Sequence, residues 1–159
     1  MTISEIYLSI PGITGDVTTA GYAGQIAVQS VVWEMAVPLN PSTGIAAGNV
    51  NSPVFTFQAL SGSHSPLLWN ALATQQSLSN TSEVVVSYVV SKSDRLVTFV
   101  SLSLGGCYCG SYSPACDTFA AGPTATFTIQ AESVTYKVAQ FKKDNSVGGY
   151  VTASWPKRA

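Results

Sequence analysis

The residues of this sequence that could do chemistry are one histidine and three cysteines. His64 is the only histidine, and it stands between Ser63 and Ser65. Serine with a histidine base is the arrangement used for acyl transfer, but it also needs an orienting carboxylate and an approach that sequence neighbours rarely provide. The sequence has no G-x-S-x-G turn either. We therefore expect a solvent-exposed His64 where a helix begins, no enzyme activity and no cofactor.

The three cysteines, Cys107, Cys109 and Cys116, lie in one ten-residue segment. Zinc sites usually have four ligands, and only Asp117 could complete this set, so the sequence predicts no metal site. A disulfide between Cys107 and Cys116 is a possible pairing, but disulfides form in oxidising compartments. Loop cysteines without chemistry and a disulfide formed after export therefore both stay open.

The composition is that of a protein with an unusually uncharged surface. The chain of 159 residues fits one domain, and its apolar content of 46% is enough for a full core. Charged residues make up only 9%, against about 25% in ordinary domains. No charge occurs between Glu34 and Glu83. Such a surface is cheap to desolvate when copies of a protein assemble, although a Ser/Thr-rich soluble domain would look similar.

The charge pattern argues against binding to nucleic acid or to membranes. The net charge of −1 gives no attraction to phosphate or anionic lipid. The N-terminal "MTISEIYLSI" has an early acid and no basic segment before an apolar one, so we predict no signal peptide. Residues 96–116 are uncharged, but their alternation with Ser, Thr and Gly indicates strands and loops. We expect no membrane insertion.

The dominant period of the hydrophobic pattern is two, which predicts strands. The alternation changes parity near Ser30 and again near Glu132 and Ser133, where we expect β-bulges or corners. The predicted strands are "EIYLSI", "GQIAVQSVVWEMAV", "PVFTFQAL", "EVVVSYVVS", "RLVTFVSLSL", "ATFTIQAESVTYKVAQF" and "GYVTASW".

One helix interrupts the strands. The Ser65 side chain can cap the free N–H groups at the start of this helix. Pro66 suits the first helical position, because the backbone N–H of that residue makes no hydrogen bond within the helix. The apolar stripe then predicts a helix over about residues 66–78. Residues 38–53 and 105–123 read as long loops. The expected fold is mainly β, a β-barrel of two sheets or a sandwich with one α-helix alongside, in a single domain over residues 1–159.

Four segments follow one another along the chain: "IYLSIPGITGDVTTAGYAGQIAVQSVVWEM", "FTFQALSGSHSPLLWNALATQQSL", "ATFTIQAESVTYKVAQF" and "GGYVTASW". In this order they resemble the Hcp (haemolysin co-regulated protein) family of type VI secretion. In the third, Glu132, Val134 and Tyr136 match the family's late strand. The chain departs from the family at Gly62, where an Asp is usual before Ser-Pro, and in the cysteine-containing segment. A cap or salt bridge of the family is therefore expected to be missing at Gly62.

The resemblance implies a tube subunit that forms hexameric rings. The rings stack into a hollow tube, which is made in the bacterial cytoplasm, expelled by a contractile sheath, and able to carry effector proteins in its lumen. The implied partners are further copies, sheath and tip proteins, and effectors. The implied ring-stacking loop consists of Asn40, Pro41, Ser42, Thr43, Gly44, Ile45, Ala46, Ala47, Gly48 and Asn49.

Two other functions remain as alternatives to this reading. A secreted β-sandwich with a Cys107–Cys116 disulfide would be a binding module for a carbohydrate or a surface protein. An enzyme that uses His64 or a cysteine is the other. A monomer with a native disulfide would favour the first, and turnover lost on His64→Ala would favour the second.

Overall fold

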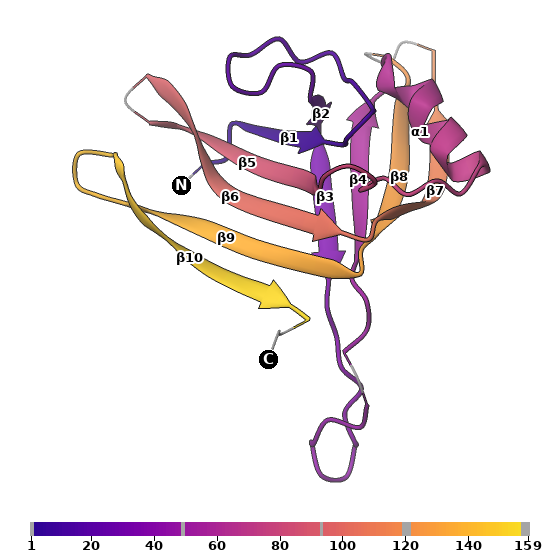
Figure 1. Ribbon diagram of the computed structural model, residues 1–159, viewed down its shortest axis with the longest axis vertical. Coiled ribbons are helices and arrows are strands. Elements are labelled where there is room, and N and C mark those ends of the chain that lie inside the picture. Colours follow the sequence, from indigo (N-terminus) through magenta and orange to yellow (C-terminus); the bar gives the residue numbers. More distant parts are fainter. Residues whose placement is uncertain (1, 49, 93, 119–121, 157–159) are drawn as a thin grey trace.

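The computed structural model describes residues 2–48, 50–92, 94–118 and 122–156, which form two antiparallel sheets and one helix (Figure 1). One sheet has the strand order β10-β9-β6-β5-β1-β2 and the other the order β3-β4-β8-β7. The mainly-β class with two sheets and one helix is confirmed, although the sheets stay separate and do not close into one barrel. The elements are β1 (Glu5–Ser9), β2 (Ile26–Val28), β3 (Ser30–Glu34), β4 (Val54–Leu60), α1 (His64–Ala73), β5 (Val84–Lys92), β6 (Arg95–Gly105), β7 (Tyr108–Ala115), β8 (Thr124–Gln130), β9 (Ser133–Phe141) and β10 (Val147–Trp155).

The two changes of parity mark the places where the chain passes from one sheet to the other. Gln29 separates β2 of the larger sheet from β3 of the smaller one. Ala131 and Glu132 separate β8 of the smaller sheet from β9 of the larger one. Both are therefore corners rather than bulges within one ladder. A strand that changes sheet must present its other face to keep apolar residues inside, which is why the alternation shifts there.

The core lies between the sheets and is built around stacked aromatic rings. The rings of Phe57 and Phe127 have centroids 5.3 Å apart, and Trp33 stacks on Phe55 at 5.1 Å. The three phenylalanines have no exposed surface. Large rings from β3, β4 and β8 thus fill the space that faces the larger sheet.

Helix α1 begins two residues earlier and ends five residues earlier than the sequence pattern predicts. At its end the Gln76 N–H donates to the Ala71 carbonyl and the Gln75 N–H to the Leu72 carbonyl. Gln75 has a φ of 54°, in the left-handed region. These bonds form a Schellman motif, which stops the helix although the apolar pattern continues.

Strand β7 was not predicted, because residues 105–123 read as a loop. It pairs with β8 from Tyr108 to Ala115, with an irregularity between Cys109 and Ser111. Most of its side chains are exposed, so its sequence lacks the alternation of a half-buried strand. Pro114 fits there because β7 is at the sheet's edge.

Within the described part of the chain, the one helix is too short to cross a membrane.

Candidate assembly surfaces

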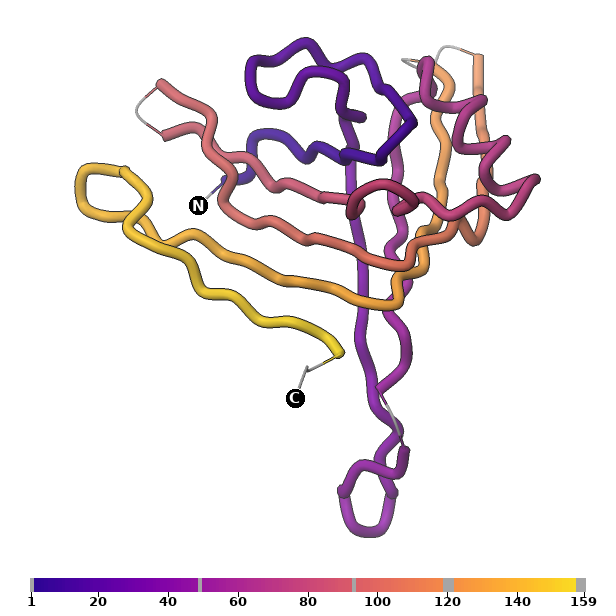
Figure 2. The backbone as a smooth tube through the Cα atoms, in the orientation of Figure 1, coloured from indigo at the N-terminus to yellow at the C-terminus, as the bar shows by residue number. Residues whose placement is uncertain are grey.

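Residues 35–48 and 50–53 form an arm that extends far beyond the two sheets (Figures 1 and 2). It continues β3 and β4 away from the body of the molecule, and backbone hydrogen bonds join its two sides. The Asn51 N–H donates to the Ala36 carbonyl at 2.9 Å, and the Ala47 N–H to the Pro38 carbonyl at 2.7 Å. The arm is therefore an extended hairpin with a defined shape rather than an irregular loop.

Local polar contacts define the end of the arm. The Asn40 N–H donates to the Ile45 carbonyl, and the Gly44 N–H donates to the Asn40 carbonyl, both at 2.8 Å. The Asn40 side-chain oxygen accepts from the Ser42 N–H at 2.9 Å. Gly44 has a φ of +70°, which a residue with a Cβ rarely adopts. The predicted stacking residues 40–48 thus lie in one structured turn, while Asn49 lies outside the described residues.

The surface of the arm is apolar and uncharged. Leu39 is 58% exposed and Ile45 is 67% exposed, and no charged residue occurs in residues 35–53. Large apolar side chains that face solvent on a projecting hairpin are typical of a contact surface. Because no charge must be desolvated, covering this surface would cost little.

A carboxylate holds the start of α1, although it comes from a distant part of the chain. Asp16 Oδ1 accepts from the Ser63 hydroxyl at 2.6 Å, and Asp16 Oδ2 accepts from the Ser63 N–H at 3.2 Å. The hydroxyl bond first, and then the backbone bond, lower the pKa of Asp16. A Cβ at position 62 would collide with Oδ2 of Asp16, so Gly62 leaves the room that this carboxylate needs. The N-cap residue Ser63 makes no side-chain cap hydrogen bond, as expected from the missing acid at position 62, and Asp16 instead binds Ser63 from a distant part of the chain.

His64 is buried, not exposed as predicted from the sequence. Only 4% of its surface is accessible, and its Nδ1 has no hydrogen-bond partner within the described structure. Burial lowers the pKa of His64, and the nearby Asp16 charge opposes that effect. The neighbouring hydroxyls have other partners: that of Ser63 donates to Asp16, and that of Ser65 accepts from the Gly62 N–H. The structure brings together no Ser–His pair at this segment.

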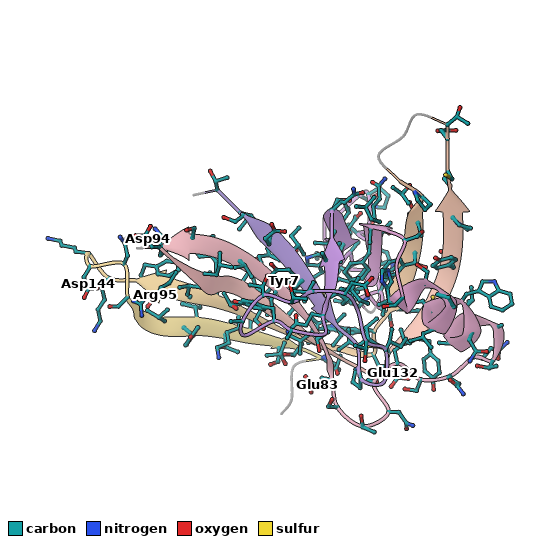
Figure 3. All side chains as sticks on the ribbon, turned by 90° about the horizontal axis from the view of Figure 1, so that it is seen from above. Tyr7, Glu83, Asp94, Arg95, Glu132 and Asp144 are labelled. Carbon is teal, nitrogen blue, oxygen red and sulfur yellow. The ribbon has the colours of Figure 1, made fainter. Side chains whose placement is uncertain are left out.

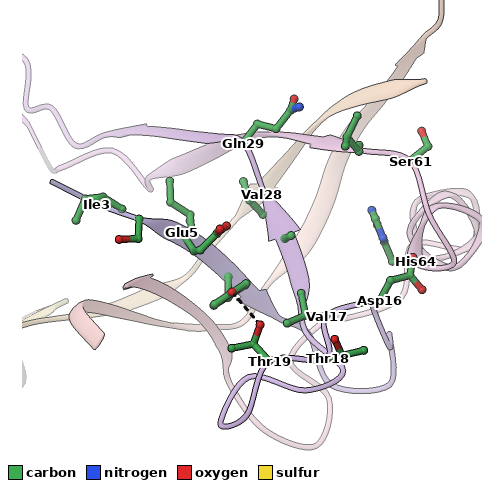
Figure 4. A pocket seen from close by; sticks show the side chains of 15 residues that line it. Ile3, Glu5, Asp16, Val17, Thr18, Thr19, Val28, Gln29, Ser61 and His64 are labelled. Atoms are coloured by element: carbon green, nitrogen blue, oxygen red, sulfur yellow. Dashed lines mark hydrogen bonds between the residues drawn. The ribbon is translucent and has the colours of Figure 1, made fainter. Parts of the chain in front are cut away.

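His64 lines an open groove of about 900 Å³ (Figure 4). The groove is bounded by residues 3–7 of the N-terminal segment, by the turn 16–19, by residues 27–29, and by Leu60 and Ser61 at the end of β4. Glu5 and Asp16 give it two carboxylates, and no Lys or Arg is among its lining residues. Sequence reasoning missed this groove, because only the fold brings these segments together.

The cysteines are free thiols, two of them buried and one exposed. Cys107 and Cys109 are buried and Cys116 is exposed. Burial raises the pKa of Cys107 to about 12, so this thiol stays protonated and unreactive.

The predicted partners of the disulfide lie at opposite ends of β7. At about 3.3 Å per residue, this strand separates Cys107 from Cys116 by more than about 20 Å, whereas a disulfide joins Cα atoms about 4–7 Å apart. The pairing does not occur in this structure, which removes the feature that supported a disulfide-bearing binding module. The described residues also contain no cluster of three or more side chains suited to a metal ion.

The fold and these surfaces define a class: a two-sheet β-protein with one helix and a projecting hairpin that exposes apolar side chains. The family described as "Type VI secretion system effector, Hcp" matches residues 7–139. The chain therefore belongs to the Hcp family of type VI secretion proteins.

Solved structures show the same fold at low sequence identity. An Hcp1 from Salmonella typhimurium has a TM-score of 0.76 at 16% identity, covering 97% of this chain and 95% of that one. A mutant Hcp1 from E. coli EAEC 042 has a TM-score of 0.73 at 19% identity, covering 95% and 97%. A chain described as a type six secretion system protein has a TM-score of 0.82 at 15% identity, covering 97% and 95%. The search of curated proteins gave no match.

Proposed function

We propose that this protein is the structural tube subunit of a type VI secretion apparatus and not an enzyme. Its copies form hexameric rings that stack into a hollow tube, which leaves the cell and carries effector proteins in its lumen. Family membership supports the coarser part, a type VI secretion tube or effector protein. The observation that carries the finer part is the arm, a shaped and uncharged hairpin that presents Leu39 and Ile45 to solvent.

In the proposed tube the arm of one ring contacts the neighbouring ring. The arm runs in the direction of β3 and β4 and reaches beyond every other part of the molecule (Figure 2). Its exposed apolar side chains would be buried on stacking, where apolar area is stabilised by about 25 cal/mol per Å². Copies of the chain, sheath and tip proteins, and effectors are the proposed partners, with synthesis in the cytoplasm before export.

The arm gives a direct test of stacking. We expect Leu39→Ser with Ile45→Ser to leave single rings intact and to abolish longer tubes, because the arm lies outside the sheets that form the body. Negative-stain microscopy with light scattering measures both states. Val32→Ser is the matched control, since Val32 is 68% exposed but lies on β3 in the body. Shortening residues 43–49 should also weaken the stacking of rings and leave single rings intact. Normal tubes from either arm variant would contradict this role of the arm.

A further inference from the structure

Most of the positively charged side chains that the structure describes lie at one end of the molecule. Four cations gather at the tips of two neighbouring hairpins, β5–β6 and β9–β10, where Figure 3 labels Arg95. Lys92 Nζ lies 5.0 Å from the centre of the Phe141 ring, which connects the two tips. Only two carboxylates, Asp94 and Asp144, lie at the same end. We call the four cations the basic tips; they are Lys92, Arg95, Lys142 and Lys143.

The groove beside His64 has the opposite character. Its two charged side chains are the carboxylates of Glu5 and Asp16. Apolar walls flank them, contributed by Ile3, Val17 and Leu60. A groove with acids between apolar walls suits a Lys or Arg side chain, whose aliphatic stem packs on apolar surface while its head reaches a carboxylate.

A second observation, independent of the acids, also indicates a missing ligand. Only 4% of the surface of His64 is accessible, and its side chain lines the groove (Figure 4). Its Nδ1 has no hydrogen-bond partner within the described structure. A buried polar atom without a partner costs about 1–3 kcal/mol, so such atoms are rare in complete structures. A hydrogen-bond donor that enters the groove would bring a polar partner close to His64.

The acids of the groove and the basic tips are not paired with each other within one copy, although Asp16 accepts two hydrogen bonds from Ser63. Among the described residues, no Lys or Arg forms an ion pair with Asp or Glu. The basic tips lie at the end of the larger sheet that is far from α1, whose first residue lines the groove (Figure 1). The other end of the groove is nearer to them, because Glu5 pairs with Val89 on β5. One copy therefore offers an acidic groove and basic tips on different elements, which can form a heterologous contact between copies.

We propose that the groove binds the basic tips of a second copy of this chain, with Glu5 and Asp16 as the acceptors. The inference rests on the proposed function, since it assigns the contact between neighbours within a ring. A contact made by opposite charges on two different surfaces fixes the register of the subunits and weakens as salt rises.

Charge reversal tests the contact. Glu5 and Arg95 are both exposed, so each can be replaced without opening the core. At low salt we expect Glu5→Lys, and separately Arg95→Glu, to raise the concentration for half-assembly about tenfold or more, as measured by analytical ultracentrifugation. The double variant Glu5→Lys with Arg95→Glu should recover most of the lost assembly, because the two charges are exchanged and can pair again. Glu83→Lys is the control, as an exposed acid outside the groove.

Circular dichroism checks that each variant is folded, and Glu5→Gln gives a milder change at the same place. The groove contact is overturned if the wild type assembles into rings and Glu5→Lys, Glu5→Gln and Arg95→Glu do so equally well. If the wild type forms only a salt-sensitive dimer that Glu5→Lys dissociates, the groove contact stands and the ring proposal fails. A wild type that stays monomeric at high concentration overturns both.

Discussion

At the scale of single residues, Asp16, Gly62 and Ser63 show how a small residue makes room for a contact between distant segments. The family's usual acid before Ser-Pro is absent, yet a carboxylate still binds Ser63. It arrives from the turn after β1, and Gly62 gives it room. Sequence spacing could not indicate this contact, because the partners are 47 positions apart.

The first prediction concerns this small site. Gly62→Ala would place a Cβ against Oδ2 of Asp16 and displace the carboxylate from Ser63. Losing these exposed hydrogen bonds should lower the free energy of unfolding slightly, as measured by urea denaturation. In an Asp16→Ala background the same substitution should cost much less, because the displaced group is gone. Equal losses in both backgrounds would show that Asp16 is not the cause.

The second prediction concerns His64 and pH. Its pKa is lowered from 6.5 in the folded state, so the unfolded chain binds the proton more readily. Stability from this group is therefore present above about pH 6.5 and is lost as the pH falls from there towards the lower folded pKa. The urea midpoint of the wild type should fall between pH 7.5 and pH 5.5. His64→Gln should flatten that slope, whereas Asp16 stays ionised throughout this range because its pKa is lowered from 3.8.

At the scale of elements, the hydrophobic pattern predicted most strands but not their ends. Period two located the cores of nine strands, and the changes of parity near Ser30 and Glu132 located both corners. The pattern failed at β7, whose exposed edge position leaves little alternation. It also failed at the end of α1, where backbone hydrogen bonds rather than side-chain polarity stop the helix.

The Schellman motif gives a third prediction. Gln75 holds a φ of 54°, which glycine adopts without steric cost. Gln75→Gly should therefore raise the free energy of unfolding, seen as a higher melting temperature, because relief of about 1–2 kcal/mol of left-handed strain exceeds the entropic cost of glycine, about 0.5–1 kcal/mol. Gln76→Gly is the matched control, because its φ is not among the positive values, and it should destabilise instead. A lower melting temperature for Gln75→Gly would contradict the capping role.

At the scale of the whole molecule, the order of the four segments predicted the family, while the surfaces needed the fold. The position of the arm was predicted, as an uncharged segment after the second long strand. The backbone hydrogen bonds that make it a hairpin were not predicted. The groove was missed because Glu5, Asp16 and His64 meet only when β1, its following turn and α1 come together. In the proposed contact, the few charges of the chain would specify its neighbours, because the charged residues of the groove are acids and most of those at the hairpin tips are cations.

The strand pairing also bears on how this chain reaches its native state. Strand β1 pairs Glu5 with Val89, and β4 pairs Val54 with Gln130, so both sheets depend on partners far along the chain. Proteins of such high contact order fold slowly, since long loops must close before any pairing is rewarded. Neither sheet is complete until the C-terminal third has left the ribosome. In the proposed tube, the nascent chain therefore cannot offer its complete contact surfaces before β8, β9 and β10 have been made.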